Sequence, residues 1–119
     1  MNKVNIAEKL SLFASHYDPK IVGELNHQYV KLVKFKGAFD WHHHKNEDEL
    51  FLVIKGEFDL QLKNETIRVK EGEFIIVPRG VEHCPKADEE VHVLLFEPMS
   101  TLNTGSVETE KTKRTLQKI

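Results

Sequence analysis

Residues 40–56 read DWHHHKNEDELFLVIKG, and this stretch decides the fold of the 119-residue chain. If the histidine run is extended, the alternation of side chains along a strand sends His42 and His44 to the same face. A bend after the run lets the chain reverse, and Glu49 then begins an apolar run that we interpret as the next strand. Two imidazoles and one carboxylate can therefore converge on one point. Such a ligand set is common in iron and zinc sites.

A second stretch, residues 72–83, reads GEFIIVPRGVEH: a turn glycine, an apolar strand, a tight Pro-x-Gly turn and a final histidine. Together the stretches follow G-x4-H-x-H-x4-E-x6-G and G-x5-P-x-G-x2-H. These patterns resemble the two motifs of the cupin superfamily, directly over residues 37–87 and, with flanking strands, from about residue 20 to residue 97. The spacing from Gly37 to the first histidine is one residue shorter than in most cupins, and Ala87 stands where asparagine is frequent. Neither difference falls on a ligand position.

The resemblance implies an all-β fold, an antiparallel jelly-roll β-barrel, and a divalent metal ion in each chain (Fe, Mn, Zn or Ni). Position by position, it carries the ligand roles over to His42, His44, Glu49 and His83. The most similar members are small single-domain cupins, often labelled mannose-6-phosphate-isomerase-like. Cupins include isomerases, lyases, dioxygenases and binding or sensor domains, so membership alone selects no reaction.

The rest of the chain independently favours a sandwich or barrel, because eight or nine short strand-like runs are separated by brief Gly, Asn and Pro turns. The runs span residues 21–25, 29–35, 39–44, 50–54, 58–62, 66–69, 74–77, 83–85 and 91–96. We expect an N-terminal helix within residues 1–18, over residues 5–16, a cupin β-barrel domain over residues 19–98, and a polar C-terminal tail over residues 99–119. The composition of the tail favours a loose segment over an arm that lies along a neighbouring subunit.

Composition excludes several classes of function. Seventeen basic and nineteen acidic residues give a net charge of −2, which argues against nucleic acid as a partner. No apolar run approaches the length of a membrane span, and the single cysteine, Cys84, excludes an internal disulfide. A cytoplasmic protein is the simplest interpretation. The small size, and the aromatic residues Phe39 and Trp41 on the face opposite the ligands, favour a homodimer.

Two residues are candidates for proton transfer. His92, on the closing strand, is either a cavity-lining acid or base or a hydrogen-bonded core histidine. Tyr29 shares a strand face with Lys31, and both either offer polar groups to a ligand or lie in solvent. By alternation His43 points away from the ligands, and Cys84 is expected to be a small buried residue rather than a nucleophile.

The sequence therefore predicts a metal-dependent enzyme, of isomerase, lyase or dioxygenase type, that acts on a small oxygenated metabolite such as a sugar. The alternative is a non-catalytic cupin that binds or senses a small ligand. A phosphosugar isomerase is disfavoured, because Lys31 and Arg79 are the only basic residues near the motifs that could hold a phosphate.

Overall fold

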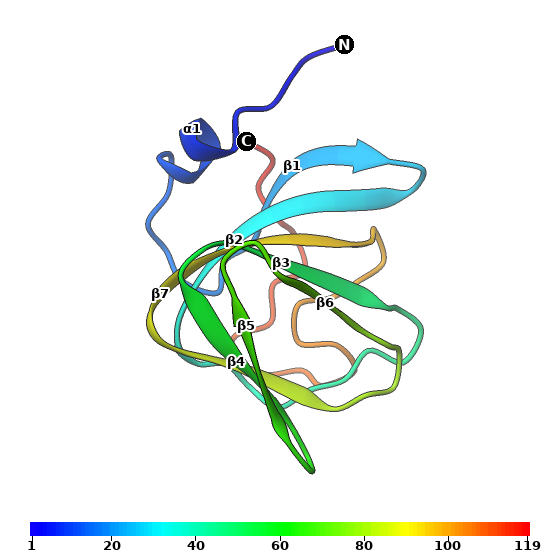
Figure 1. Cartoon of the computed structure of the whole chain (residues 1–119). Helices are drawn as coiled ribbons and strands as arrows, with labels where there is room; N and C mark the ends of the chain where they lie inside the picture. The colour runs from blue at the N-terminus through cyan, green and yellow to red at the C-terminus, as the bar shows by residue number, and fades with distance from the viewer.

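The computed structural model describes residues 1–119 as an antiparallel β-barrel of seven strands with one short helix (Figure 1). The elements are α1 (Ile6–Leu10), β1 (Lys20–Leu25), β2 (Gln28–Ala38), β3 (Glu49–Lys55), β4 (Glu57–Leu62), β5 (Thr66–Lys70), β6 (Phe74–Val77) and β7 (His83–Pro98). The sheet order is β1-β2-β7-β3-β6, and β4 pairs with both β5 and β7. Every pair of neighbouring strands is antiparallel, which confirms the predicted jelly-roll class.

The sixteen-residue strand β7 closes the barrel, because it pairs with three other strands. It runs beside β2 along one edge, and along the other edge it pairs first with β4 and then with β3. The two strands expected over residues 83–85 and 91–96 are therefore one. A register shift in the β2–β7 ladder between Phe35 and Gly37 lets the pair bend while both strands continue.

The histidine run is not a strand of its own. His42 forms an isolated bridge with His83, in which each backbone N–H donates to the other residue's carbonyl at 3.0 and 2.9 Å. The predicted alternation nevertheless holds here, since His42 and His44 are buried while Trp41 is exposed. The bridge ties the first motif directly to the last residue of the second.

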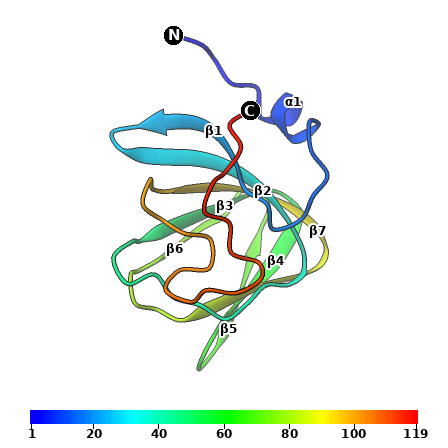
Figure 2. The ribbon, with the colours of Figure 1, turned by 180° about the vertical axis from the view of Figure 1, so that it is seen from behind.

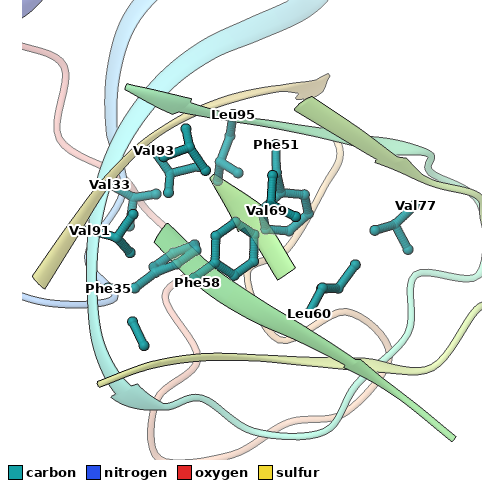
Figure 3. Close-up of a cluster of buried hydrophobic side chains, with 12 residues drawn as sticks. Val33, Phe35, Phe51, Phe58, Leu60, Val69, Val77, Val91, Val93 and Leu95 are labelled. Carbon is teal, nitrogen blue, oxygen red and sulfur yellow. The ribbon is translucent and has the colours of Figure 1, made fainter. Parts of the chain in front are cut away.

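The core fills the barrel with twelve buried apolar side chains, most of which point toward one another in Figure 3. Its centre is aromatic: the ring centroids of Phe35 and Phe58 lie 5.4 Å apart, and those of Phe51 and Phe58 lie 5.8 Å apart. On β7, alternate residues from Val91 to Leu95 face this core. Burial of each large apolar side chain contributes roughly 1.5–3 kcal/mol.

The helix is shorter than the predicted span of residues 5–16. Asn5 caps it as expected, with its side chain accepting from the backbone N–H of Glu8 at 2.9 Å. The helix ends at Leu10 because the following chain turns onto the sheet, where the Phe13 carbonyl accepts from the Lys34 ammonium at 2.6 Å. None of the protein's helical structure has the length and apolar character needed to cross a membrane.

Residues 99–119, which we call the C-terminal strap, are not the loose tail that composition favoured. The strap runs across the barrel and returns to β1 (Figure 2), where Ile21 bonds through its backbone to Gln117 and Ile119. Two of its threonines, Thr101 and Thr104, are buried. The prediction of a loose tail from composition was wrong because polar side chains of the strap form hydrogen bonds with the barrel rather than with water.

Candidate metal centre

Four side chains from distant parts of the chain meet at one end of the barrel. His42 and His44 lie on the loop after β2, Glu49 is the first residue of β3, and His83 is the first residue of β7. All four are buried, and each offers a ligand atom within 4.8 Å of the others. The structure thus brings together the four residues that the sequence proposed as ligands.

Two of the imidazoles are held in the orientation that a metal ligand needs. Nδ1 of His42 lies 2.8 Å from the Asp40 carbonyl, and Nδ1 of His83 lies 2.9 Å from the Val81 carbonyl. A carbonyl only accepts, so in both rings Nδ1 carries the hydrogen. Nε2 of a neutral ring is then a free lone pair, which is the arrangement found in metal-bound histidines.

The third imidazole has no hydrogen-bond partner. Nε2 of His44 lies 2.9 Å from Oε1 of Glu49 without the angle of a hydrogen bond, and its Nδ1 is also unpartnered. A buried polar ring with neither nitrogen satisfied is unfavourable in a folded protein. A divalent ion between His44 and Glu49 would remove this cost, so the donor set fits a metal.

The charges also suit a metal. Burial, with a further contribution from His83, lowers the pKa of His42 from 6.5 to about 4, so this ring is neutral at neutral pH. Burial would raise the pKa of Glu49, but the hydrogen bond with Glu97 and the adjacent imidazoles of His44 and His83 hold that pKa well below its ordinary value. The site therefore offers a neutral imidazole beside an ionised carboxylate, the protonation states that metal binding requires.

A cavity of about 40 Å³ adjoins His42 and Glu49. One water needs roughly 10–15 Å³ by this measure, so the cavity holds a few waters or a ligand of a few atoms. Its walls are mostly apolar or aromatic, and the polar residues that reach it apart from the two ligands are Tyr17, Glu97 and Asn103. The hydrogen of the Tyr17 hydroxyl is not available to a ligand, because it is donated to the Gly37 carbonyl at 2.6 Å.

A buried ion pair at this cavity was not predicted from the sequence. The Lys31 ammonium lies 2.6 Å from Oε1 of Glu97, and each residue is only 2% exposed. Burial, and then the nearby Glu49, raise the pKa of Glu97 well above its usual range, while Lys31 opposes the shift. The sequence did contain a signal for this pair. Strand alternation places Glu97 on the same inward face of β7 as Val93 and Leu95, and a charged side chain at a buried position needs a partner of opposite charge.

The two residues proposed for proton transfer do not reach the cavity. His92 lies on the outer face of β7, where its Nε2 contacts Glu90 at 3.0 Å and its side chain borders α1. Tyr29 shares its strand face with Lys31, as predicted, but lies at the end of β2, against the strap near Lys118. Of the alternatives predicted for each residue, the cavity-lining one was therefore wrong. Strand alternation fixes the face of His92, and the length of β2 separates Tyr29 from the cavity.

Phe39 also differs from the expectation that it would pack on the face opposite the ligands. It lines the cavity, stacks on Tyr17 with ring centroids 4.8 Å apart, and meets the His42 ring edge-on at 5.3 Å. β2 ends at Ala38 and residues 39–41 belong to no strand, so strand alternation does not extend from Phe39 to His42. Trp41 remains outside, with the Lys63 ammonium over its ring.

The other predicted placements hold. His43 is half-buried and lies outside the ligand cluster, and its carbonyl accepts from the backbone of Ser106 in the strap at 3.0 Å. Cys84 is buried, and its thiol contacts the Phe39 carbonyl at 3.1 Å. Neither side chain therefore adds a group to the candidate site.

Residues 30–97 match the family described as the cupin domain, and all four ligand candidates lie within that match. The chain belongs to the cupin family. A crystal structure of a cupin-2 domain containing protein from Shewanella frigidimarina NCIMB 400 superimposes on this cupin with a TM-score of 0.79. It is 39% identical, and the match covers 80% of this chain and 93% of that one.

Two curated proteins show the range of its relatives. The uncharacterized protein YdbB of Bacillus subtilis (strain 168) is 40% identical over 63 residues, 52% of this chain and 56% of that protein. A 3-hydroxyanthranilate 3,4-dioxygenase of Xenopus laevis is 24% identical over 102 residues, which is 79% of this chain and 36% of that enzyme. The cupin spans about half the length of the first curated relatives that it matches.

Proposed function

We propose that this cupin binds one divalent metal ion through His42, His44, Glu49 and His83 and uses it to act on a small oxygenated metabolite. One observation carries the proposal: four buried ligand atoms lie within 4.8 Å of one another, and the ring of His44 has no other partner. When bound, such an ion supplies Lewis acidity and, if it is iron, redox chemistry. The chain's own residues hold the ion, and the mostly apolar walls of the neighbouring cavity leave room for only a small ligand or a few waters.

Among the reaction types, the site favours a dioxygenase or a lyase over a sugar-phosphate isomerase. The similarity to the Xenopus laevis dioxygenase supports the first of these. A phosphate would need a basic group at the cavity, but Lys31 is paired with Glu97. Arg79 is exposed and bonds to Asp48 through its backbone N–H at 2.8 Å. The small cavity also suits a few-atom ligand better than a whole sugar.

A second candidate is a non-catalytic cupin in which the metal anchors a small ligand. The observation that favours it is the placement of His92 and Tyr29, because neither residue expected for proton transfer lines the cavity. In such a module, the apolar walls and the metal would select and hold the ligand without turning it over.

Elemental analysis tests the metal site. We expect about one metal ion per chain in untagged wild-type protein and in His43→Ala, and well below one in His42→Ala/His44→Ala. The double variant loses two of the four ligands, whereas His43 lies outside the cluster. Equal metal content in wild type and double variant, or no metal after reconstitution with Fe(II), Mn(II), Zn(II) or Ni(II), would contradict the proposal. Oxygen-uptake and isomerase assays on the loaded protein then separate enzyme from binder.

We propose a second copy of this chain as the macromolecular partner, in a homodimer. The outer face of β6, β3 and β7 carries two cross-strand rows of apolar residues: Ile76, Leu50 and Phe96, and Phe74, Leu52 and Leu94. Phe74 is 62% exposed and Ile76 is 53% exposed, on a strand at the edge of the sheet. A continuous apolar face of this kind usually marks an interface, and a two-fold axis would place it against itself.

Light scattering after gel filtration checks the dimer. We expect the mass of two chains for wild type and of one chain for Phe74→Glu, because the substitution puts a charge in the middle of an apolar interface. Leu25→Glu, at an exposed apolar position of β1, is the matched control and should remain dimeric. A monomeric wild type, or a dimeric Phe74→Glu, would remove this face from the interface.

A further inference from the structure

A second pocket lies between the C-terminal strap and strands β1 and β2. Residues from the first and the last part of the strap line it, because the strap leaves the barrel at residue 99 and returns to β1 (Figure 2). The pocket has a volume of about 270 Å³, close to the lower end of the range for ligand pockets. It shares no lining residue with the cavity at the metal centre, so it is a separate site.

Every charged residue at this pocket, which we call the strap pocket, is basic: Lys31, Lys113, Arg114 and Lys118. The ammonium groups of Lys31 and Lys118 lie beside one aromatic ring, 5.8 and 6.0 Å from the centroid of Tyr29. Two cationic groups therefore come from different segments to one wall of the strap pocket.

The nearby carboxylates do not balance this charge. Asp18 lies 3.0 Å from the Lys20 ammonium and 3.6 Å from that of Lys113, so one carboxylate serves two lysines. Lys118 has no carboxylate partner. Arg114 is paired with Glu108, but both side chains are largely exposed, where an ion pair contributes little. The strap pocket therefore carries an excess of positive charge.

A buried hydroxyl at the strap pocket also lacks a partner. Thr101 is only 7% exposed, and its Oγ1 has no hydrogen bond within the protein. A hydroxyl both donates and accepts, so this lack of a partner does not depend on a protonation state. Because buried polar groups are nearly always satisfied, the hydroxyl indicates an oxygen that arrives with a ligand.

We propose that the strap pocket binds a small phosphorylated metabolite. A phosphate monoester carries nearly two negative charges and three acceptor oxygens, which match ammonium, guanidinium and hydroxyl donors on several sides. The apolar side chains of Met99, Leu102 and Leu116 line the same pocket and provide contacts for a small organic group. No ligand candidate of the metal centre takes part, so this inference does not rest on the proposed function.

The test compares phenyl phosphate with benzoate, which share a ring and differ in the anionic group. Each is titrated into ¹⁵N-labelled protein with one equivalent of Zn(II), and amide chemical shifts locate the site and give its affinity. We expect phenyl phosphate to shift the amides of residues 99–102 and 113–118. It should bind there about tenfold more tightly than benzoate, because an added hydrogen bond between charged groups is worth roughly that factor.

A double variant connects this binding to the basic residues. Lys113→Met/Lys118→Met should weaken the binding of phenyl phosphate about tenfold, since it removes two of the cationic groups. Lys36→Met/Lys70→Met is the matched control, because it removes the same charge from two exposed lysines outside the strap pocket and should keep the affinity of wild type. The comparison separates a local site from general attraction between the protein and an anion.

Three results would overturn the site: no binding of phenyl phosphate, shifts confined to residues 42–49, or equal affinities of the two double variants. Equal affinity for benzoate and phenyl phosphate at the strap would overturn the assignment to phosphates. Each of these results leaves the metal content of the protein unchanged, so the proposed function is tested separately.

Discussion

Gly105→Ala is expected to destabilise the protein by about 2–5 kcal/mol and to weaken metal binding. Gly105 has a φ of 62°, and an added Cβ would lie 1.9 Å from the His43 carbonyl oxygen and 3.3 Å from Nδ1 of His44. The next residue of the strap, Ser106, is bonded to the same carbonyl at 3.0 Å. A methyl group here must therefore push the strap off the loop that carries His42 and His44.

Gly72→Ala is the matched control, because Gly72 has a φ of 81° but nothing within 4 Å of an added Cβ. It should cost only the left-handed penalty, about 1–2 kcal/mol. Urea unfolding measures both variants, limited proteolysis of residues 99–119 shows whether the strap has detached, and competition with a chelator gives the metal affinity. If the two substitutions lower the free energy of unfolding equally and the strap still resists proteolysis, the strap does not pack tightly against the loop that carries His42 and His44.

The ligand set was predictable from the sequence because the geometry of the two histidines in the first motif is local, and the resemblance to the cupin motifs added His83. One residue between His42 and His44 places both on one side of an extended segment, and this holds even though the segment is not a strand of a sheet. Glu49, at the start of β3, pairs with Val77 at the end of β6, and the short turn after β6 brings His83 back to the same end of the barrel. Most strand positions were predictable for a similar reason, because most of the predicted runs are apolar stretches between turn residues.

The parts that were missed depend on contacts between distant segments. Lys31 looked like an exposed or ligand-facing residue until its proximity to Glu97 on the paired strand was known. The prediction for Phe39 was wrong because β2 ends at Ala38, so strand alternation does not continue to the histidines. The strap was interpreted as a loose tail because composition reports what a segment can bury alone, whereas Thr109 and Lys111 satisfy their polar groups on Asp40.

The metal-free protein should lose stability as the pH falls from about 6.5 toward 4, and His42 should account for about 3 kcal/mol of that loss. The pKa of the ring is about 4 when folded, with burial as the main cause, against 6.5 in the unfolded chain. Below pH 6.5 the unfolded state therefore binds a proton that the folded state does not, and the free energy of unfolding falls. Below about pH 4 both states are protonated, and the contribution of this ring stops changing.

Urea unfolding of chelator-treated protein between pH 7 and pH 4 measures this loss. Comparison with variants isolates the contribution of His42, because all the other titrating groups are shared. The free energy of unfolding should fall less steeply with pH in His42→Gln, which has no imidazole to protonate, and as steeply as in wild type in His43→Gln. With metal bound, the loss should begin at lower pH, because a proton must then displace the ion from the ring. A slope that is the same in wild type and His42→Gln would mean that the ring titrates as it does in water. The conclusion that His42 is buried and neutral in the folded protein, on which the metal centre depends, would then be wrong.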